Sequence, residues 1–149
     1  MSKQDEAGLI LQLYELRREE KMRKAREWYF REFNPRNIED FTKEMFGENS
    51  AYLRMVVTYW EMAAALVNNS AIDLQLFNDT NGECWGVFAK FEPILGDIRS
   101  GFAPNFAAQI EKLVDATPDG RQLTAGIRER TQAVRAEMTA RRQEAAVKA

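Results

Sequence analysis

The longest apolar stretch of the chain runs from residue 52 to residue 67 and reads YLRMVVTYWEMAAALV. On a helical wheel with a step of about 100° per residue, its apolar side chains form two broad arcs. One arc holds Leu53, Val56, Val57, Trp60, Ala64 and Val67, and the other holds Met55, Tyr59, Met62 and Leu66. A narrow polar strip between the arcs contains Arg54, Thr58 and Glu61. The pattern predicts a central helix over residues 50–69 that is buried on two sides.

Shorter apolar segments predict further helices, each bounded by turn or capping signals such as Asn34-Pro35 and Gly47. Their expected ranges are 3–33, 37–46, 70–77, 83–99, 105–114 and 121–145. Ser70 is the expected N-cap of one helix, and Pro93 predicts a kink or a restart in another. No stretch alternates apolar and polar residues over a length that would form a strand, so no strand is predicted. We expect an all-α fold, an irregular bundle of about six or seven helices with long N- and C-terminal helices.

A chain of 149 residues fits one helical domain, and we place its core at about residues 22–115. The terminal helices, 3–33 and 121–145, are expected to be partly peripheral. Each terminal helix carries an apolar stripe in addition to the residues expected to form the core of one chain. The stripes consist of Leu9, Leu13 and Leu16 at one end and of Leu123, Ile127, Val134 and Met138 at the other. We predict that they form an interface between two chains, with pairing inside one chain as the alternative.

Composition indicates a cytoplasmic protein without a membrane span. The chain is 45% hydrophobic and 30% charged, which is ordinary for a globular protein. No window reaches the roughly 18 consecutive apolar residues that a transmembrane helix needs. The first residues are polar, and the single cysteine, Cys84, cannot form an internal disulfide.

Charge is distributed unevenly along the chain. Residues 34–119 carry 6 basic and 13 acidic side chains, a balance of −7, whereas residues 120–149 carry 7 basic and 3 acidic, a balance of +4. An acidic body argues against DNA binding, because a nucleic-acid surface must be basic to displace counterions. The basic C-terminal segment could contact RNA or an acidic partner, but we expect a solvated helix face there.

The absence of histidine and the single cysteine exclude several chemistries. Ser-His-Asp triads, histidine-containing zinc sites and Cys₄ sites need residues that this chain lacks. What remains is a carboxylate site for Mg²⁺, for which Glu15, Glu19 and Glu20 are the candidates. Because arginines and lysines are interleaved with them, we expect a self-paired helix face instead. The prediction is therefore a protein without metal or cofactor, and without enzymatic activity.

Glu61 is the most unusual residue of the central helix, because a buried carboxylate is costly without a partner. The structural interpretation is a satisfied polar group, paired with Arg54 or with a residue of the 83–99 helix. The functional interpretation is a small-ligand site in an aromatic pocket. That site would be made of Arg54, Tyr59, Trp60, Glu61 and Trp85.

The stretch YWEMAAALVNNSAIDLQLFND, residues 59–79, resembles a family of bacterial helical proteins of unknown function. The resemblance lies in the aromatic-aromatic-Glu run at residues 59–61, the polar turn at 68–69 and the Ile-Asp-Leu run at 72–74. It implies an all-α fold and brings no activity with it.

We therefore hypothesise a non-enzymatic interaction or scaffold module that forms a homodimer or binds another protein. The first alternative is a ligand-binding regulatory domain with an aromatic pocket around Trp60 and Glu61. The second is a carboxylate-metal enzyme of the Mg²⁺ type.

Overall fold

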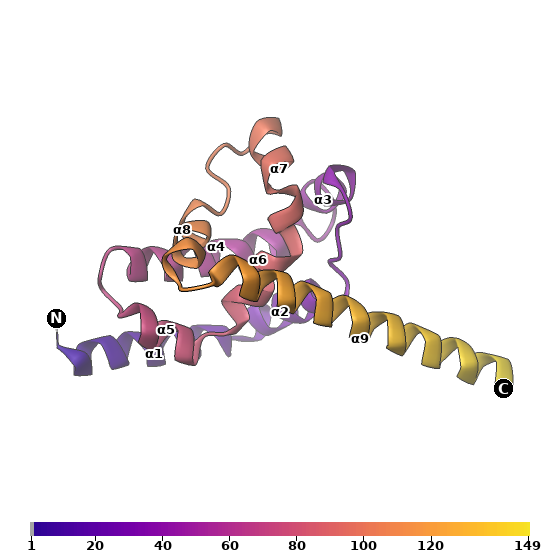
Figure 1. Ribbon diagram of the computed structural model, residues 1–149, viewed down its shortest axis with the longest axis horizontal. Coiled ribbons are helices and arrows are strands. Elements are labelled where there is room, and N and C mark those ends of the chain that lie inside the picture. Colours follow the sequence, from indigo (N-terminus) through magenta and orange to yellow (C-terminus); the bar gives the residue numbers. More distant parts are fainter. Residues whose placement is uncertain (1) are drawn as a thin grey trace.

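The computed structural model describes residues 2–149, and every regular element in that range is a helix (Figure 1). The prediction of an all-α fold is confirmed. In chain order the elements are α1 (Lys3–Arg17), α2 (Glu20–Arg31), α3 (Ile38–Met45), α4 (Ser50–Asn68), α5 (Leu74–Thr80), α6 (Glu83–Phe91), the 3₁₀ helix η1 (Glu92–Ile94), α7 (Leu95–Gly101), α8 (Ala108–Ala116) and α9 (Gly120–Lys148).

The described range contains more helices than six or seven because two predicted helices are each divided. The expected helix 3–33 breaks after Arg17, and the Glu19 carboxylate accepts a hydrogen bond from the Met22 amide to start α2. The expected helix 83–99 breaks at Pro93, which lies in η1. Proline has no N–H to donate within a helix, so the chain tightens into a 3₁₀ turn before α7 begins.

The segment after α4 also differs from the expectation. Ser70 was predicted to cap a helix, but it takes a left-handed conformation with φ 64° and its amide donates to the Val67 carbonyl. Ser70 therefore belongs to the end of α4. The next helix, α5, starts later, where the Asp73 carboxylate accepts a hydrogen bond of 2.9 Å from the Leu76 amide.

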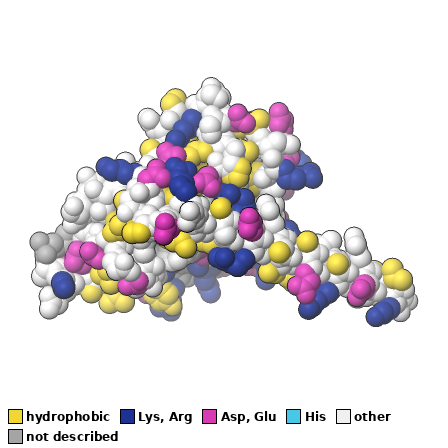
Figure 2. Space-filling view, in the orientation of Figure 1, with side chains coloured by type: hydrophobic (Ala, Val, Ile, Leu, Met, Phe, Trp, Pro, Cys, Tyr) yellow, Lys and Arg dark blue, Asp and Glu magenta, His cyan; other side chains and the backbone are white. Residues whose placement is uncertain are grey.

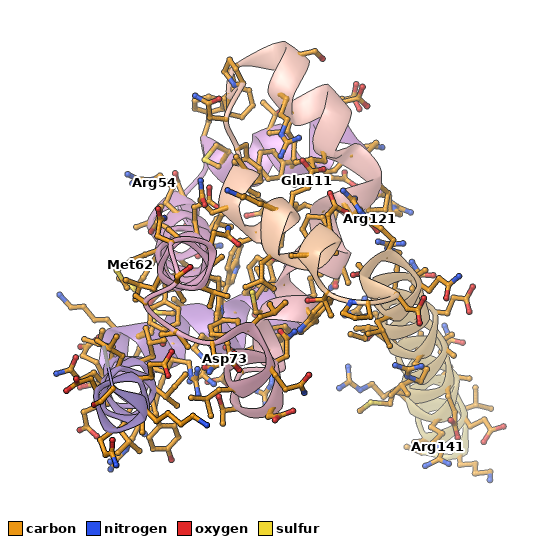
Figure 3. All side chains as sticks on the ribbon, turned by 60° about the vertical axis from the view of Figure 1, so that its left-hand side comes forward. Arg54, Met62, Asp73, Glu111, Arg121 and Arg141 are labelled. Atoms are coloured by element: carbon orange, nitrogen blue, oxygen red, sulfur yellow. The ribbon has the colours of Figure 1, made fainter. Side chains whose placement is uncertain are left out.

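The central helix α4 packs against α2 on one side and α8 on the other. The first predicted arc is buried, and Leu53, Val56 and Trp60 are 0% exposed. The second arc is only partly covered, and Met62 is exposed. Met62 and Arg54 point away from the rest of the molecule in Figure 3, and both are exposed.

The long helix α9 starts on the body of the molecule and then leaves it. Its first turns pack against α6 and α8, where Thr124 is fully buried. Gly120 begins the helix because a Cβ there would lie 2.0 Å from the Val114 carbonyl oxygen. From residue 129 onward every side chain except Arg135 is exposed. This half of α9 projects as an arm, and its tip and the start of α1 lie at opposite ends of the molecule (Figure 1).

Candidate functional site

Glu61 is satisfied by the start of another helix. One carboxylate oxygen accepts a hydrogen bond of 3.1 Å from the Gln109 amide, and the other accepts one of 2.9 Å from the Ile110 amide. Ala107, the N-cap residue of α8, has φ 55° and no side chain that could bond these amides. Glu61 therefore supplies from α4 the acceptor and negative charge that a helix N-terminus favours.

The prediction that Glu61 is hydrogen-bonded is correct, but its expected partners were wrong. Neither Arg54 nor a residue of α6 forms a hydrogen bond or ion pair with its carboxylate. Arg54 is exposed and donates instead to the Ser50 hydroxyl at 3.3 Å. Two turns beyond Glu61, the side-chain amide of Asn68 donates to the Gln109 backbone carbonyl at 2.9 Å. Helix α4 therefore holds the start of α8 at two points.

The other residues of the predicted aromatic pocket belong to the core. The Tyr59 hydroxyl donates to the Leu13 carbonyl of α1. Trp60 is fully buried with the Arg17 guanidinium 5.2 Å from its ring centre, and Trp85 is also buried. Since Trp60 is closed off on all sides, a ligand would reach it only if the core opened.

The predicted acidic residues of the first helices bond to groups close to them in sequence. Glu15 pairs with Arg18 at 3.1 Å, and Glu20 pairs with Lys24 at 3.2 Å. Glu19 is the N-cap of α2. Within residues 2–149, no three Asp, Glu or Cys side chains are grouped so that they could hold a metal ion.

The two terminal stripes are divided between the core and the surface. On α1, Leu13 is 3% exposed and Leu9 packs against the core, so of the predicted stripe only Leu16 remains on the surface. On α9, Ile127 packs against the core. The exposed apolar side chains of the two helices are Leu11, Tyr14 and Leu16 on α1 and Leu123, Val134, Met138 and Val147 on α9.

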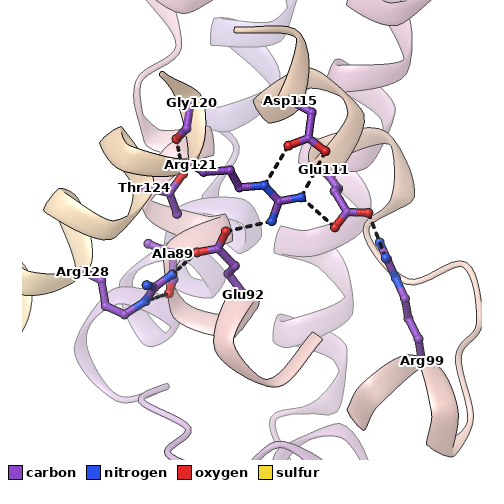
Figure 4. A network of polar contacts seen from close by, with 9 residues as sticks. All are labelled: Ala89, Glu92, Arg99, Glu111, Asp115, Gly120, Arg121, Thr124 and Arg128. Atoms are coloured by element: carbon purple, nitrogen blue, oxygen red, sulfur yellow. Dashed lines mark hydrogen bonds and ion pairs between the residues drawn. The ribbon is translucent and has the colours of Figure 1, made fainter. Parts of the chain in front are cut away.

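A network of ion pairs fastens the first turns of α9 to the body (Figure 4). Arg121 donates to Asp115 at 2.7 Å, to Glu92 at 2.8 Å and to Glu111 at 2.9 Å. Arg128 donates to Glu92 and to the Ala89 carbonyl, and Arg99 of α7 pairs with Glu111 of α8. The network therefore joins α9 to four other elements, namely α6, η1, α7 and α8.

The same network lowers the pKa values of Asp115 and Glu111. The hydrogen bond from Arg121 lowers the pKa of Asp115. Burial raises the pKa of Glu111, but hydrogen bonds from Arg121 and Arg99 outweigh burial and leave that pKa below its ordinary value. Both carboxylates are therefore held in the charged form that binds arginine.

A groove with a volume of about 1020 Å³ lies between α9 and the body. Its walls come from the end of α2, the α2–α3 connection, α3, α6, η1 and α9 from Arg128 onward. Its apolar surface includes Phe30, Pro93 and Ile94, and its basic groups include Lys90, Arg128 and Arg135. None of the five residues predicted for a ligand site lines this groove.

Lys90 of α6 lines the groove and caps the C-terminal end of α2. Its Nζ, with three N–H groups to donate, lies within hydrogen-bonding distance of four acceptors: the carbonyl oxygens of Tyr29 at 2.6 Å, Phe33 at 2.8 Å and Phe30 at 3.1 Å, and Asn34 Oδ1 at 3.1 Å. Helices end with carbonyls that lack a partner, and Lys90 satisfies several of them at once. Burial and, to a smaller extent, the nearby Arg135 lower the pKa of Lys90 to about 7.

Sequence reasoning missed the groove and its cations. For Lys90 a signal existed, because it interrupts the apolar run of α6 in the same way that Glu61 interrupts α4. For Arg121 and Arg135 there was none, since both stand among other arginines on a polar helix.

Comparison with known proteins identifies the family of the chain. The chain belongs to a family described as "Domain of unknown function (DUF4760)", whose model matches residues 5–117. The match covers α1 to α8 and ends before α9. No curated protein and no solved structure matches the chain. Within the described residues, no helix is both long enough and apolar enough to cross a membrane.

Proposed function

We propose that this protein is an interaction module that associates with a second copy of itself through α1 and α9. The observation that carries the proposal is the uncovered arm of α9, on which Val134 is 55% exposed and Met138 51%. Apolar side chains can be followed along this arm in Figure 2. A single helix with so few contacts is marginal in water, so a surface that covers it would stabilise it.

The arm is held in one direction, which favours a specific contact. Arg121 and Arg128 fix the first turns to the body, and a continuous α-helix carries that orientation to residue 148. A binding element that is already oriented loses less entropy when it associates.

The surface proposed to cover the arm is the exposed face of α1 in a second chain. Leu11, Tyr14 and Leu16 are all more than half exposed there. Because α1 and the tip of α9 lie at opposite ends of the molecule, they suit a reciprocal pairing in which each arm contacts the other chain's α1. Such an isologous interface closes with two-fold symmetry.

Charge favours this pairing over contact between two α9 arms. Residues 129–148, which form the arm, carry 5 basic and 3 acidic side chains, whereas residues 3–17 carry 2 basic and 3 acidic. Two positively charged arms would repel each other, while an arm and α1 have opposite net charges.

Light scattering coupled to gel filtration tests the proposal. The full chain is compared with a chain that ends at Arg130, which keeps Thr124 and the ion pairs of Arg121 and Arg128. We expect a dimer for the full chain at micromolar concentration and a folded monomer for the shortened one. A full chain that stays monomeric across this range would overturn the proposal.

A pair of substitutions separates the apolar stripe from the helix as a whole. Val134→Gln with Met138→Gln should convert the dimer to a monomer, because both residues lie on the stripe. The control is Ala133→Gln with Ala140→Gln, which changes two exposed positions elsewhere on the same helix and should leave the dimer intact. Equal effects of the two pairs would exclude the stripe as the contact surface.

A further inference from the structure

The groove between α9 and the body has the size and the lining of a small-molecule site. Ligand pockets usually have volumes of about 300–1,000 Å³ and a mostly apolar lining with a few polar groups. This groove measures about 1020 Å³ and presents Phe30, Pro93 and Ile94. Gly86 also lines it, and a Cβ there would already lie 3.4 Å from the Phe30 ring. A side chain larger than that of alanine at residue 86 would therefore narrow the groove.

One arginine of the groove has no partner. The Arg135 side chain is half-buried, yet no acceptor among residues 2–149 lies within hydrogen-bonding distance of its guanidinium. The neighbouring Arg128 has both Glu92 and the Ala89 carbonyl. The other arginines of the described residues whose guanidinium has no hydrogen-bond acceptor are Arg23, Arg36, Arg130 and Arg142, and all four are exposed to water.

Lys90 is a second basic group of the same groove, and because its pKa is about 7 it is only partly protonated at neutral pH. All four of its acceptors are neutral oxygens, so they satisfy its donors without neutralising its charge. No carboxylate in residues 2–149 forms an ion pair with Lys90 or Arg135. Partly buried cations without a counter-ion are costly, and an anion in the groove would compensate them.

We propose that the groove binds a small monocarboxylate with an alkyl or aryl body, whose carboxylate pairs with Arg135 while its body lies against Phe30, Pro93 and Ile94. Arginine suits a carboxylate because its planar donors can bind both oxygens at once. Glu32, Asp40 and Glu44 also line the groove. Arg36 and Lys43 line it too, and Arg36 pairs with Asp40. Among the arginines of the lining, Arg135 is therefore the one with neither an ion pair nor an acceptor in residues 2–149, and a single free guanidinium suits a singly charged carboxylate.

Calorimetric titration with four probes tests this site: octanoate below its micelle concentration, octanol, acetate and inorganic phosphate. We expect octanoate to bind at least about tenfold more tightly than the other three, since it alone offers both a carboxylate and an apolar body. Octanol binding equally well would show an apolar site without anion recognition. Phosphate binding more tightly would show that the ligand class is wrong. Either result, or no binding of octanoate, overturns the proposal.

Two variant pairs connect binding to the groove. Arg135→Gln should weaken octanoate binding by about tenfold or more, because a hydrogen bond to a charged group is lost. Arg130→Gln removes the same charge from an exposed position of the same helix and should leave binding unchanged. Ala136→Phe should block the groove, which Ala136 lines, whereas Ala133→Phe should not. Equal affinities within either pair would contradict the assignment.

The groove belongs to one chain, so this inference does not depend on the proposed dimer. The Val134→Gln, Met138→Gln double variant should be monomeric and should still bind octanoate. Loss of binding in that monomer would show that the site requires a second chain and would overturn the assignment to a single groove.

Discussion

The two longest helices of the molecule, α4 and α9, have different sources of stability. Helix α4 is covered by α2 and α8, and its one carboxylate, Glu61, is bonded to the backbone of α8. Helix α9 has 29 residues, but only its first turns touch the body. Beyond them its polar groups pair within the helix, as Arg141 does with Glu137 at 2.7 Å. Arg141 lies far out on the arm in Figure 3. Tertiary packing holds α4, whereas local helix propensity and any partner must hold the arm of α9.

The largest expected difference concerns matched leucines on the two helices. Leu53→Ala on α4 should lower the free energy of unfolding by about 2–5 kcal/mol, because Leu53 is fully buried and its loss leaves a cavity. Leu123→Ala on α9 should cost less than about 1 kcal/mol, because Leu123 is half exposed. Urea denaturation followed by circular dichroism measures both. Similar losses would mean that α9 is packed as tightly as α4.

A glycine decides whether α9 docks at all. Gly120→Val should destabilise the protein by more than about 2 kcal/mol, because a Cβ there would lie 2.0 Å from the Val114 carbonyl oxygen and the backbone would have to move. The control is Gly126→Ala, whose Cβ would meet only the flexible end of Arg130, at 3.2 Å. That change should be neutral or stabilise by up to about 1 kcal/mol. A tolerated Gly120→Val would show that the junction is loose.

Glu61 bonds to another helix, whereas Glu137 bonds within its own helix, and the two can be compared by substitution. Glu61→Ala should cost about 1–3 kcal/mol, since it leaves two amides of α8 without their acceptor. Glu137→Ala removes only an exposed pair with Arg141 and should cost less than about 1 kcal/mol. Hydrogen exchange of the Gln109 and Ile110 amides gives an independent readout, and both should exchange faster only in the Glu61 variant. Unchanged protection there would mean that α8 is capped in another way.

The helices could be predicted where the apolar pattern is dense. Residues 50–69 were expected for the helix found at Ser50–Asn68, and 121–145 for the one at Gly120–Lys148. The break after Arg17 could not be predicted, because RREEK has high helix propensity. That break turns α1 so that Leu13 enters the core while Leu11 and Tyr14 remain outside.

The contacts of polar residues were much less predictable than the helices. A carboxylate in an apolar helix indicated that Glu61 needs a partner, but the backbone amides that donate to it here carry no signal in the sequence. Arg121 shows the same limit, because its three acceptors are brought together only by the fold. The groove brings together the α2–α3 connection and α9, which are more than 90 residues apart in sequence, so no local pattern marks it.

The smallest expected effect is a dependence of α9 docking on pH. The pKa values of Asp115 and Glu111 lie below their ordinary values of 3.8 and 4.5 in the folded protein. In the unfolded chain these carboxylates take up protons first as the pH falls, so their contribution is fully present above the ordinary values and is lost as the pH falls through the folded values. The free energy of unfolding should therefore decrease between about pH 6 and about pH 3. Arg121→Gln removes the hydrogen bonds that lower both pKa values and should make this decrease smaller, whereas Arg141→Gln, which affects only the arm, should leave it unchanged. Urea denaturation at both pH values measures the effect, and an equal decrease in the two variants would show that the network does not couple α9 docking to pH.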